Sequence, residues 1–93
     1  MRAALIIPAL DEEASIGVSL DEVPHGLYQQ ILVVDNGSSD HTSQVAQAHG
    51  AKVLCEPRRG YGNACLCALA ALSEDIEAVV FMDGDGSDVP AEA

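Results

Sequence analysis

Four short apolar runs alternate with longer, more polar segments along this chain. Each run has the length and residue types of a strand that is buried on both faces of a sheet. The intervening segments carry apolar side chains at three- and four-residue intervals, which predicts helices. The predicted order is therefore β-α-β-α-β-α-β, with strands over residues 3–7, 31–34, 52–55 and 77–82.

Residues with specific backbone preferences mark the boundaries of these elements. Pro8 is expected to end the first strand, and Asp11 to cap the helix that follows it. Asp40 is expected to cap the second helix. The sequence then predicts a flexible loop over residues 56–62 and a third helix over residues 63–72.

Strands that alternate with helices through short connections predict one α/β domain over residues 1–93, built on a Rossmann-like doubly wound parallel sheet. Right-handed crossovers and the common strand order 3-2-1-4 place the first strand between the second and the fourth. Ligands bind such sheets outside the carboxyl ends of the strands, at the switch point. The polar segments fall on that edge, at residues 8–12, 35–40, 58–62 and 83–88.

An acidic cluster, Asp83, Asp85 and Asp88, directly follows the fourth predicted strand. Carboxylates this close repel one another, and a hard divalent cation such as Mg²⁺ or Mn²⁺ would offset that repulsion. Gly84 and Gly86 would let a ligand approach the backbone closely. A solvated acidic turn is the alternative interpretation.

The net charge of -11, with only four Lys and Arg residues, argues against a nucleic-acid partner and against binding an anionic membrane surface. It suits a site that binds cations, or anions through a bound cation. The three cysteines form no C-x-x-C pair, which favours reduced thiols and a cytoplasmic setting. No apolar run approaches the ~20 residues of a membrane span.

Four stretches match, in order, the signatures of one enzyme family: residues 6–13 (IIPALDEE), 33–42 (VVDNGSSDHT), 59–64 (RGYGNA) and 81–85 (FMDGD). Together they resemble the family-2 glycosyltransferases, which have the GT-A fold. Among these, the chain looks closest to the polyprenyl-phosphate sugar transferases of the dolichol-phosphate mannosyltransferase type.

The resemblance implies an inverting, metal-dependent transfer of a sugar from a UDP- or GDP-sugar, with a polyprenyl phosphate as one acceptor and membrane association of the full-length enzyme. It implies a donor-nucleotide site made of Pro8, Leu10, Glu12, Asp35, Asn36, Gly60, Gly62, Asp83 and Gly84, and a Mg²⁺ or Mn²⁺ site at Asp83 and Asp85. The metal would stabilise charge on the leaving diphosphate. Arg58 or Arg59 would add a charge-assisted contact to phosphate.

The sequence departs from the family pattern at two of these positions. Asn36 stands where a second aspartate is common, and Leu10 replaces a frequent aromatic residue. The chain also stops at Ala93, whereas family members continue with the acceptor-binding half and any general base. We therefore expect a donor-binding half with little transferase activity alone, which pairs with a missing C-terminal half or self-associates.

Three alternatives remain at this point. The residues from Asp83 to Ser87 are similar to the D-x-D-G-[TSV] motif of haloacid-dehalogenase-type phosphatases, with Asp83 as nucleophile and Asp85 as general acid. The glycines at 60 and 62 resemble a dinucleotide-binding fingerprint that lacks its third glycine. A non-catalytic acidic α/β module would bind metal without nucleotide.

Overall fold

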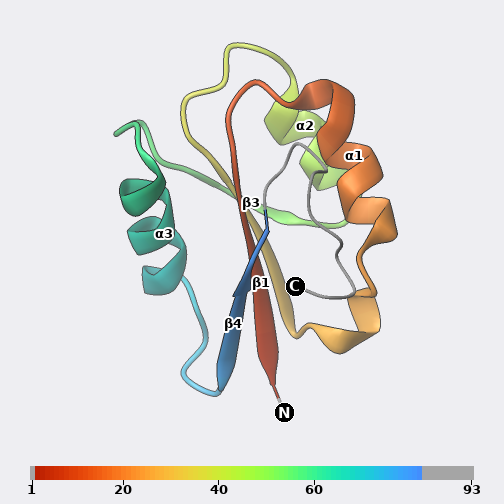
Figure 1. Cartoon of the computed structure of the whole chain (residues 1–93), viewed down its shortest axis with the longest axis vertical. Helices are drawn as coiled ribbons and strands as arrows, with labels where there is room; N and C mark the ends of the chain where they lie inside the picture. Colours follow the sequence, from red (N-terminus) through yellow and green to blue (C-terminus); the bar gives the residue numbers. More distant parts are fainter. Residues whose placement is uncertain (1, 83–93) are drawn as a thin grey trace.

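A four-stranded parallel sheet forms the centre of the computed structural model, which describes residues 2–82 (Figure 1). The strands stand in the order β3-β2-β1-β4, so the predicted order 3-2-1-4 and the predicted fold class are confirmed. Their bounds are β1 (Ala3–Ala9), β2 (Gln30–Asp35), β3 (Lys52–Cys55) and β4 (Ala78–Phe81).

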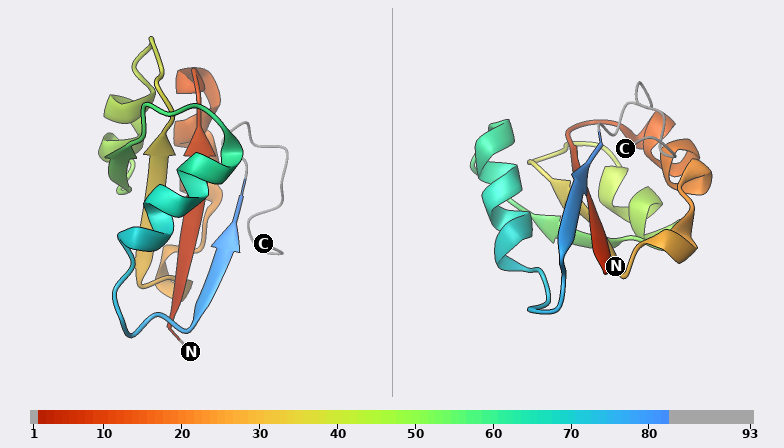
Figure 2. Two further views of the ribbon diagram at one scale, coloured as in Figure 1. Left: turned by 90° about the vertical axis from the view of Figure 1, so that its left-hand side faces the viewer. Right: turned by 60° about the horizontal axis from the view of Figure 1, so that its bottom comes forward.

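Helices cover both faces of the sheet, as Figure 2 shows. α1 (Glu13–Glu22) and α2 (Thr42–Ala48) lie on one face, and α3 (Tyr61–Ala70) lies on the other. A short 3-10 turn, η1 (His25–Leu27), leads from α1 toward β2. In the part of the chain that the structure describes, no helix is long and apolar enough to cross a membrane.

The apolar run of β1 is explained by its central position between two helical layers. Leu5 and Ile7 pack into the core beneath α1 and α2, whereas Ile6 packs beneath α3. All three side chains are fully buried. Each contributes about 1.5–3 kcal/mol of burial free energy, so the alternation of β1 stabilises both layers at once.

Pro8 lies inside β1, so the prediction that it ends the first strand is wrong. On the β4 side, the last ladder bond runs from the N–H of Met82 to the carbonyl of Ile6 at 3.0 Å. Pro8 comes two residues after Ile6, beyond the last residue pair between β1 and β4. Proline has no backbone N–H, and at this position no hydrogen bond between the described strands is lost. On the β2 side, the carbonyl of Ala9 accepts the N–H of Asn36 at 2.9 Å, and β1 continues.

Asp11 does not cap the first helix, contrary to the prediction. The helix begins at Glu13, and Asp11 has a φ of +52°, in the left-handed region that aspartate tolerates better than most residues. Its carboxylate accepts the N–H of Ser39 at 2.7 Å. The free N–H of Glu13 is satisfied instead by the carboxylate of Asp40, at 3.2 Å.

Asp40 also contacts the second helix, although the N-cap residue of α2 is His41 and not, as was predicted, Asp40. Its carboxylate accepts the N–H of Thr42, the first residue of α2, at 3.0 Å, and it also accepts the Thr42 hydroxyl. Carboxylates at helix N-termini are favoured by the helix dipole. One side chain therefore joins the N-termini of α1 and α2, which fixes the two loops that precede them against each other.

The third helix begins two residues earlier than predicted, at Tyr61. Gly60 has a φ of +124°, a conformation that residues with a side chain rarely adopt. Its carbonyl accepts the N–H of Ala64 at 3.1 Å and so starts the helical hydrogen bonds. Gly62 consequently lies in the first turn of α3 and not in a loop.

Candidate functional site

A pocket of about 160 Å³ opens at the carboxyl end of β1, at the predicted switch point of the sheet. We call it the switch-point pocket. It brings together four residues of the predicted donor site, which come from β1, from the loop after it and from the loop after β2. Its lining consists of Pro8, Ala9, Leu10, Glu12, Asn36 and Tyr61.

Two lining residues, Ala9 and Tyr61, were not predicted from the sequence, and Tyr61 is the one with a large side chain. It was assigned to a flexible loop, but it opens α3 and remains 57% exposed at the pocket. Its ring centroid lies 6.5 Å from that of Phe81, with the planes tilted by 48°. An aromatic residue between the two glycines at 60 and 62 was the available signal, since aromatic rings are common partners of planar ligands. Leu10 stands where the family often has an aromatic residue, so Tyr61 is the aromatic side chain that lines this pocket.

A second pocket of about 300 Å³ lies beside the first, between the ends of β2 and β3. We call it the β2–β3 pocket. Of the predicted site residues in the described part of the chain, only Asp35 lines it. The remaining lining residues are Gly37, Ser38, Cys55, Glu56 and Pro57. The predicted site is therefore divided over two neighbouring hollows, with consecutive residues, Asp35 and Asn36, on their shared wall.

Asp35 is held as a carboxylate at the end of β2. One oxygen accepts the N–H of Ser38 at 2.8 Å, and the other accepts the hydroxyl of Ser43. Burial alone would raise the pKa of Asp35, but the hydrogen bonds from the two serines outweigh burial and lower the pKa below its ordinary 3.8. Asp35 is thus ionised at neutral pH. Neither serine was singled out in the sequence.

Asn36 is buried, with 8% of its surface exposed, and its side chain is bound to the loop that precedes α3. Its amide nitrogen donates to the carbonyl oxygens of Glu56 and Arg58, at 2.7 and 2.8 Å. Its amide oxygen accepts the N–H of Gly60 at 3.0 Å. The side chain therefore spans from the end of β2 to the start of α3.

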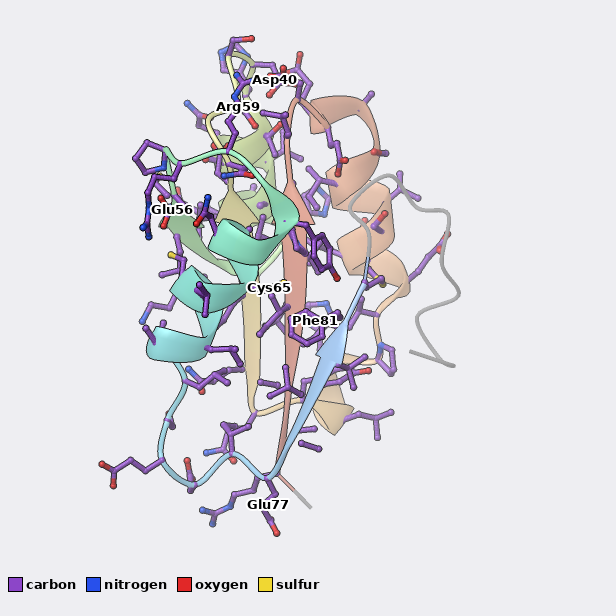
Figure 3. All side chains as sticks on the ribbon, turned by 60° about the vertical axis from the view of Figure 1, so that its left-hand side comes forward. Asp40, Glu56, Arg59, Cys65, Glu77 and Phe81 are labelled. Atoms are coloured by element: carbon purple, nitrogen blue, oxygen red, sulfur yellow. The ribbon has the colours of Figure 1, made fainter. Side chains whose placement is uncertain are left out.

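The two neighbouring arginines have different partners. The guanidinium of Arg58 donates to both carboxylate oxygens of Glu56, at 2.9 and 3.2 Å, and these bonds keep the pKa of Glu56 below its usual range. Within residues 2–82, Arg59 forms no ion pair and reaches only the carbonyl of Gly37, at 3.5 Å. Figure 3 shows Glu56 and Arg59 on the loop that leads into α3. Arg59 is the arginine left to meet an anionic ligand.

The loop from residue 10 to residue 13 is fixed over the switch-point pocket by the loop that follows β2. The N–H of Asp11 donates to the hydroxyl of Ser38 at 2.9 Å, and the N–H of Glu12 donates to the hydroxyl of Thr42 at 2.9 Å. With the two aspartate contacts described above, these bonds hold Leu10 and Glu12 in place. The pocket wall is preorganised by hydrogen bonds between two loops that are far apart in the sequence.

Gly60 and Gly62 were predicted to leave room beside a ligand. Among residues 2–82, a Cβ atom added to Gly62 would meet no atom within 4 Å. Asp83, Gly84 and Asp85 lie outside the described residues. Within residues 2–82, no three His, Cys, Asp or Glu side chains are placed to share a metal ion.

A parallel sheet of this order, with a pocket at its switch point, defines a Rossmann-like α/β protein of the GT-A type. The chain belongs to glycosyltransferase family 2, because the model for "Glycosyl transferase family 2" matches residues 4–92. This membership favours the glycosyltransferase prediction over the phosphatase, dinucleotide-binding and non-catalytic alternatives.

Relatives in mycobacteria support this assignment. An uncharacterized glycosyltransferase of Mycobacterium bovis is 43% identical over 88 residues, which are 92% of this chain and 39% of that protein. Glucosyl-3-phosphoglycerate synthase of Mycobacterium tuberculosis is 39% identical over 93 residues, with 88% of this chain and 28% of that protein covered. The chain thus spans well under half the length of these curated relatives.

A solved structure gives the same result. Glucosyl-3-phosphoglycerate synthase from Mycobacterium tuberculosis, in complex with Mn²⁺, uridine diphosphate and glucosyl-3-phosphoglycerate, superimposes with a TM-score of 0.78 and 36% identity. The superposition covers 89% of this chain and 33% of that one.

Proposed function

We propose that this chain is the donor-binding part of a glycosyltransferase that uses a uridine-diphosphate sugar and a divalent metal ion. The observation that carries the proposal is the switch-point pocket, in which Pro8, Leu10, Glu12 and Asn36 meet although they come from two separate loops and a strand. The sequence motifs predict a donor-nucleotide role for all four. An apolar wall, a carboxylate and an aromatic ring suit a nucleoside, which has both a planar base and hydroxyl groups.

Between the two predicted donor nucleotides, UDP and GDP, the relatives support UDP. The synthase from Mycobacterium tuberculosis has been solved with uridine diphosphate and, in another complex, with Mn²⁺, uridine-diphosphate-glucose and phosphoglyceric acid. We extend the uridine nucleotide from that protein to this chain because the two share the fold and are 36% identical over the aligned part, which covers 89% of this chain.

The metal enters the proposal through the same relatives, whose complexes contain Mn²⁺. The predicted ligands, Asp83 and Asp85, follow directly after Met82, whose N–H bonds to Ile6 two residues before the pocket wall begins at Pro8. Carboxylate oxygens are ligands that hard cations prefer. A bound cation would let an anionic diphosphate approach a chain whose net charge is -11.

For the acceptor, we infer a small phosphorylated acid in place of the polyprenyl phosphate predicted from the sequence. The support is the name of the glucosyl-3-phosphoglycerate synthases and the complex of one of them with phosphoglyceric acid. The inverting outcome remains a prediction. To distinguish the two acceptors, the protein that carries this chain is incubated with labelled UDP-glucose and either 3-phosphoglycerate or a polyprenyl phosphate. We expect label in a water-soluble product with 3-phosphoglycerate. Label in a solvent-extracted lipid would instead support the polyprenyl phosphate predicted from the sequence.

Donor binding is tested by calorimetric titration of the chain with UDP in the presence of Mn²⁺. Glu12→Gln keeps the shape of a pocket residue but removes its charge, and Glu22→Gln makes the same change on an exposed residue at the far end of α1. We expect Glu12→Gln to weaken UDP binding by about tenfold and Glu22→Gln to leave it within about twofold. Equal affinities for all three proteins, or no binding by any, would refute the proposed site.

A further inference from the structure

We propose that Asn36 is a positioning residue, which fastens the loop of residues 56–60 and thereby sets Tyr61 and Arg59 beside the switch-point pocket. In this role its side chain holds the site together and does not contact the base or ribose. The consequence for nucleotide binding rests on the proposed function, whereas the fastening of the loop can be tested in the free protein.

Both hydrogen-bond donors of the Asn36 side chain, and one acceptor site of its oxygen, are used by the loop. A side-chain amide has two N–H donors, and both are occupied, one by the carbonyl of Glu56 at 2.7 Å and one by the carbonyl of Arg58 at 2.8 Å. The amide oxygen accepts the N–H of Gly60 at 3.0 Å. No N–H of this side chain is left for a ligand, and the residue is 8% exposed.

These partners also explain why the residue is an asparagine. Two carbonyl oxygens face the side chain, and carbonyls can only accept hydrogen bonds. An aspartate here would present a carboxylate oxygen to both carbonyls, so that three acceptors would meet with no proton between them. The amide orientation is fixed for the same reason, because only the nitrogen can serve Glu56 and Arg58.

The fastened loop carries two residues that matter for the pocket. Gly60, with its φ of +124°, turns the chain directly from the Asn36 contact into Tyr61, a lining residue. Arg59, just before it, lies close enough to reach the carbonyl of Gly37. Freeing the loop would allow both side chains to move. Misplacing binding groups by an ångström is enough to cost much of their effect.

The first test needs no ligand and no variant. In wild-type protein, the two side-chain NH₂ protons of Asn36 and the amide proton of Gly60 should exchange with solvent much more slowly than the NH₂ protons of Asn63. Asn63 is the only other asparagine, and its side chain makes one exposed bond, to the carbonyl of Arg59 at 3.1 Å. Equally fast exchange for both asparagines would overturn the proposal even if no variant folds.

The second test compares Asn36→Asp with Asn63→Asp, which adds the same charge in the first turn of α3. We expect Asn36→Asp to shift the free-protein amide signals of residues 56–61, to shift them back when acid protonates the new carboxyl, and to weaken UDP–Mn²⁺ binding by about tenfold. Asn63→Asp should stay within about twofold of wild type. Weaker binding with unchanged signals at 56–61 would mean that Asn36 contacts the ligand, and would overturn the proposal. Failure of wild-type protein to bind UDP would refute the proposed function but leave the exchange test decisive.

Discussion

The hydroxyl of Thr42 joins the start of α2 to the loop that precedes α1, and its removal gives a defined test of the structure. Thr42 is fully buried, accepts the N–H of Glu12 at 2.9 Å and donates to the carboxylate of Asp40. Thr42→Val keeps the shape of the side chain but leaves the Glu12 N–H without this acceptor. A stranded, partly buried N–H costs about 1–3 kcal/mol, so we expect the free energy of unfolding to fall by about 2 kcal/mol.

Urea unfolding followed by circular dichroism measures this loss, and a fall of about 8–16 °C in the melting temperature should accompany it in a chain of this size. Thr42→Ser is the matched control, because it keeps the hydroxyl and loses only a methyl group, at a cost of about 1 kcal/mol. The reasoning is refuted if Thr42→Val unfolds within about 0.5 kcal/mol of wild type, or if serine costs more than valine.

Three further changes test other parts of the account. Tyr61→Ala should weaken UDP binding by about 5- to 100-fold, as expected for a lost stacking partner, whereas Tyr61→Phe should bind like wild type; equal effects in a titration would exclude stacking. The folded-state pKa of Asp35 lies below its ordinary 3.8, so Asp35 stabilises the fold above about pH 3.8 and this contribution is lost as pH falls through the folded pKa. Unfolding free energies should therefore fall more steeply with acid in wild type than in Asp35→Asn, and parallel curves would contradict this. A Cβ atom added at Gly17 would lie 2.8 Å from the ring of His49. Gly17→Ala should therefore lower the free energy of unfolding of wild type but raise it by up to about 1 kcal/mol in a His49→Ala background. A raised free energy of unfolding in both backgrounds would show that the ring moves freely.

Much of the fold could be predicted because it depends on the hydrophobic pattern of the strands and on the handedness of their connections. The apolar run of β1 is buried on both faces, and the strand order follows from right-handed crossovers. The errors came where a tertiary contact decides the local structure. Pro8 continues β1 because the neighbouring strand β4 ends before it. The N–H of Glu13 at the start of α1 is bonded by Asp40, which comes from another loop, and not by Asp11. Neither effect can be seen from the local sequence.

The candidate site shows the same division. Pro8, Leu10, Glu12 and Asn36 were predicted together from motif order, and the structure brings them to one pocket. What the motifs could not reveal is which side chain meets a ligand and which holds the protein together. Asn36 has its hydrogen bonds satisfied by backbone groups 20 to 24 residues away, and that arrangement exists only once the strands are assembled.

The central claim is that the switch-point pocket binds a uridine nucleotide with a metal ion. Its most direct test is an amide NMR titration of the chain with UDP, with and without Mg²⁺, followed by a trace of Mn²⁺ to broaden signals near the metal. The account predicts metal-dependent shifts at residues 10–12, 35–37 and 60–61, with GDP binding more weakly than UDP. Shifts that avoid these residues, or that appear with metal alone and do not change with nucleotide, would contradict it.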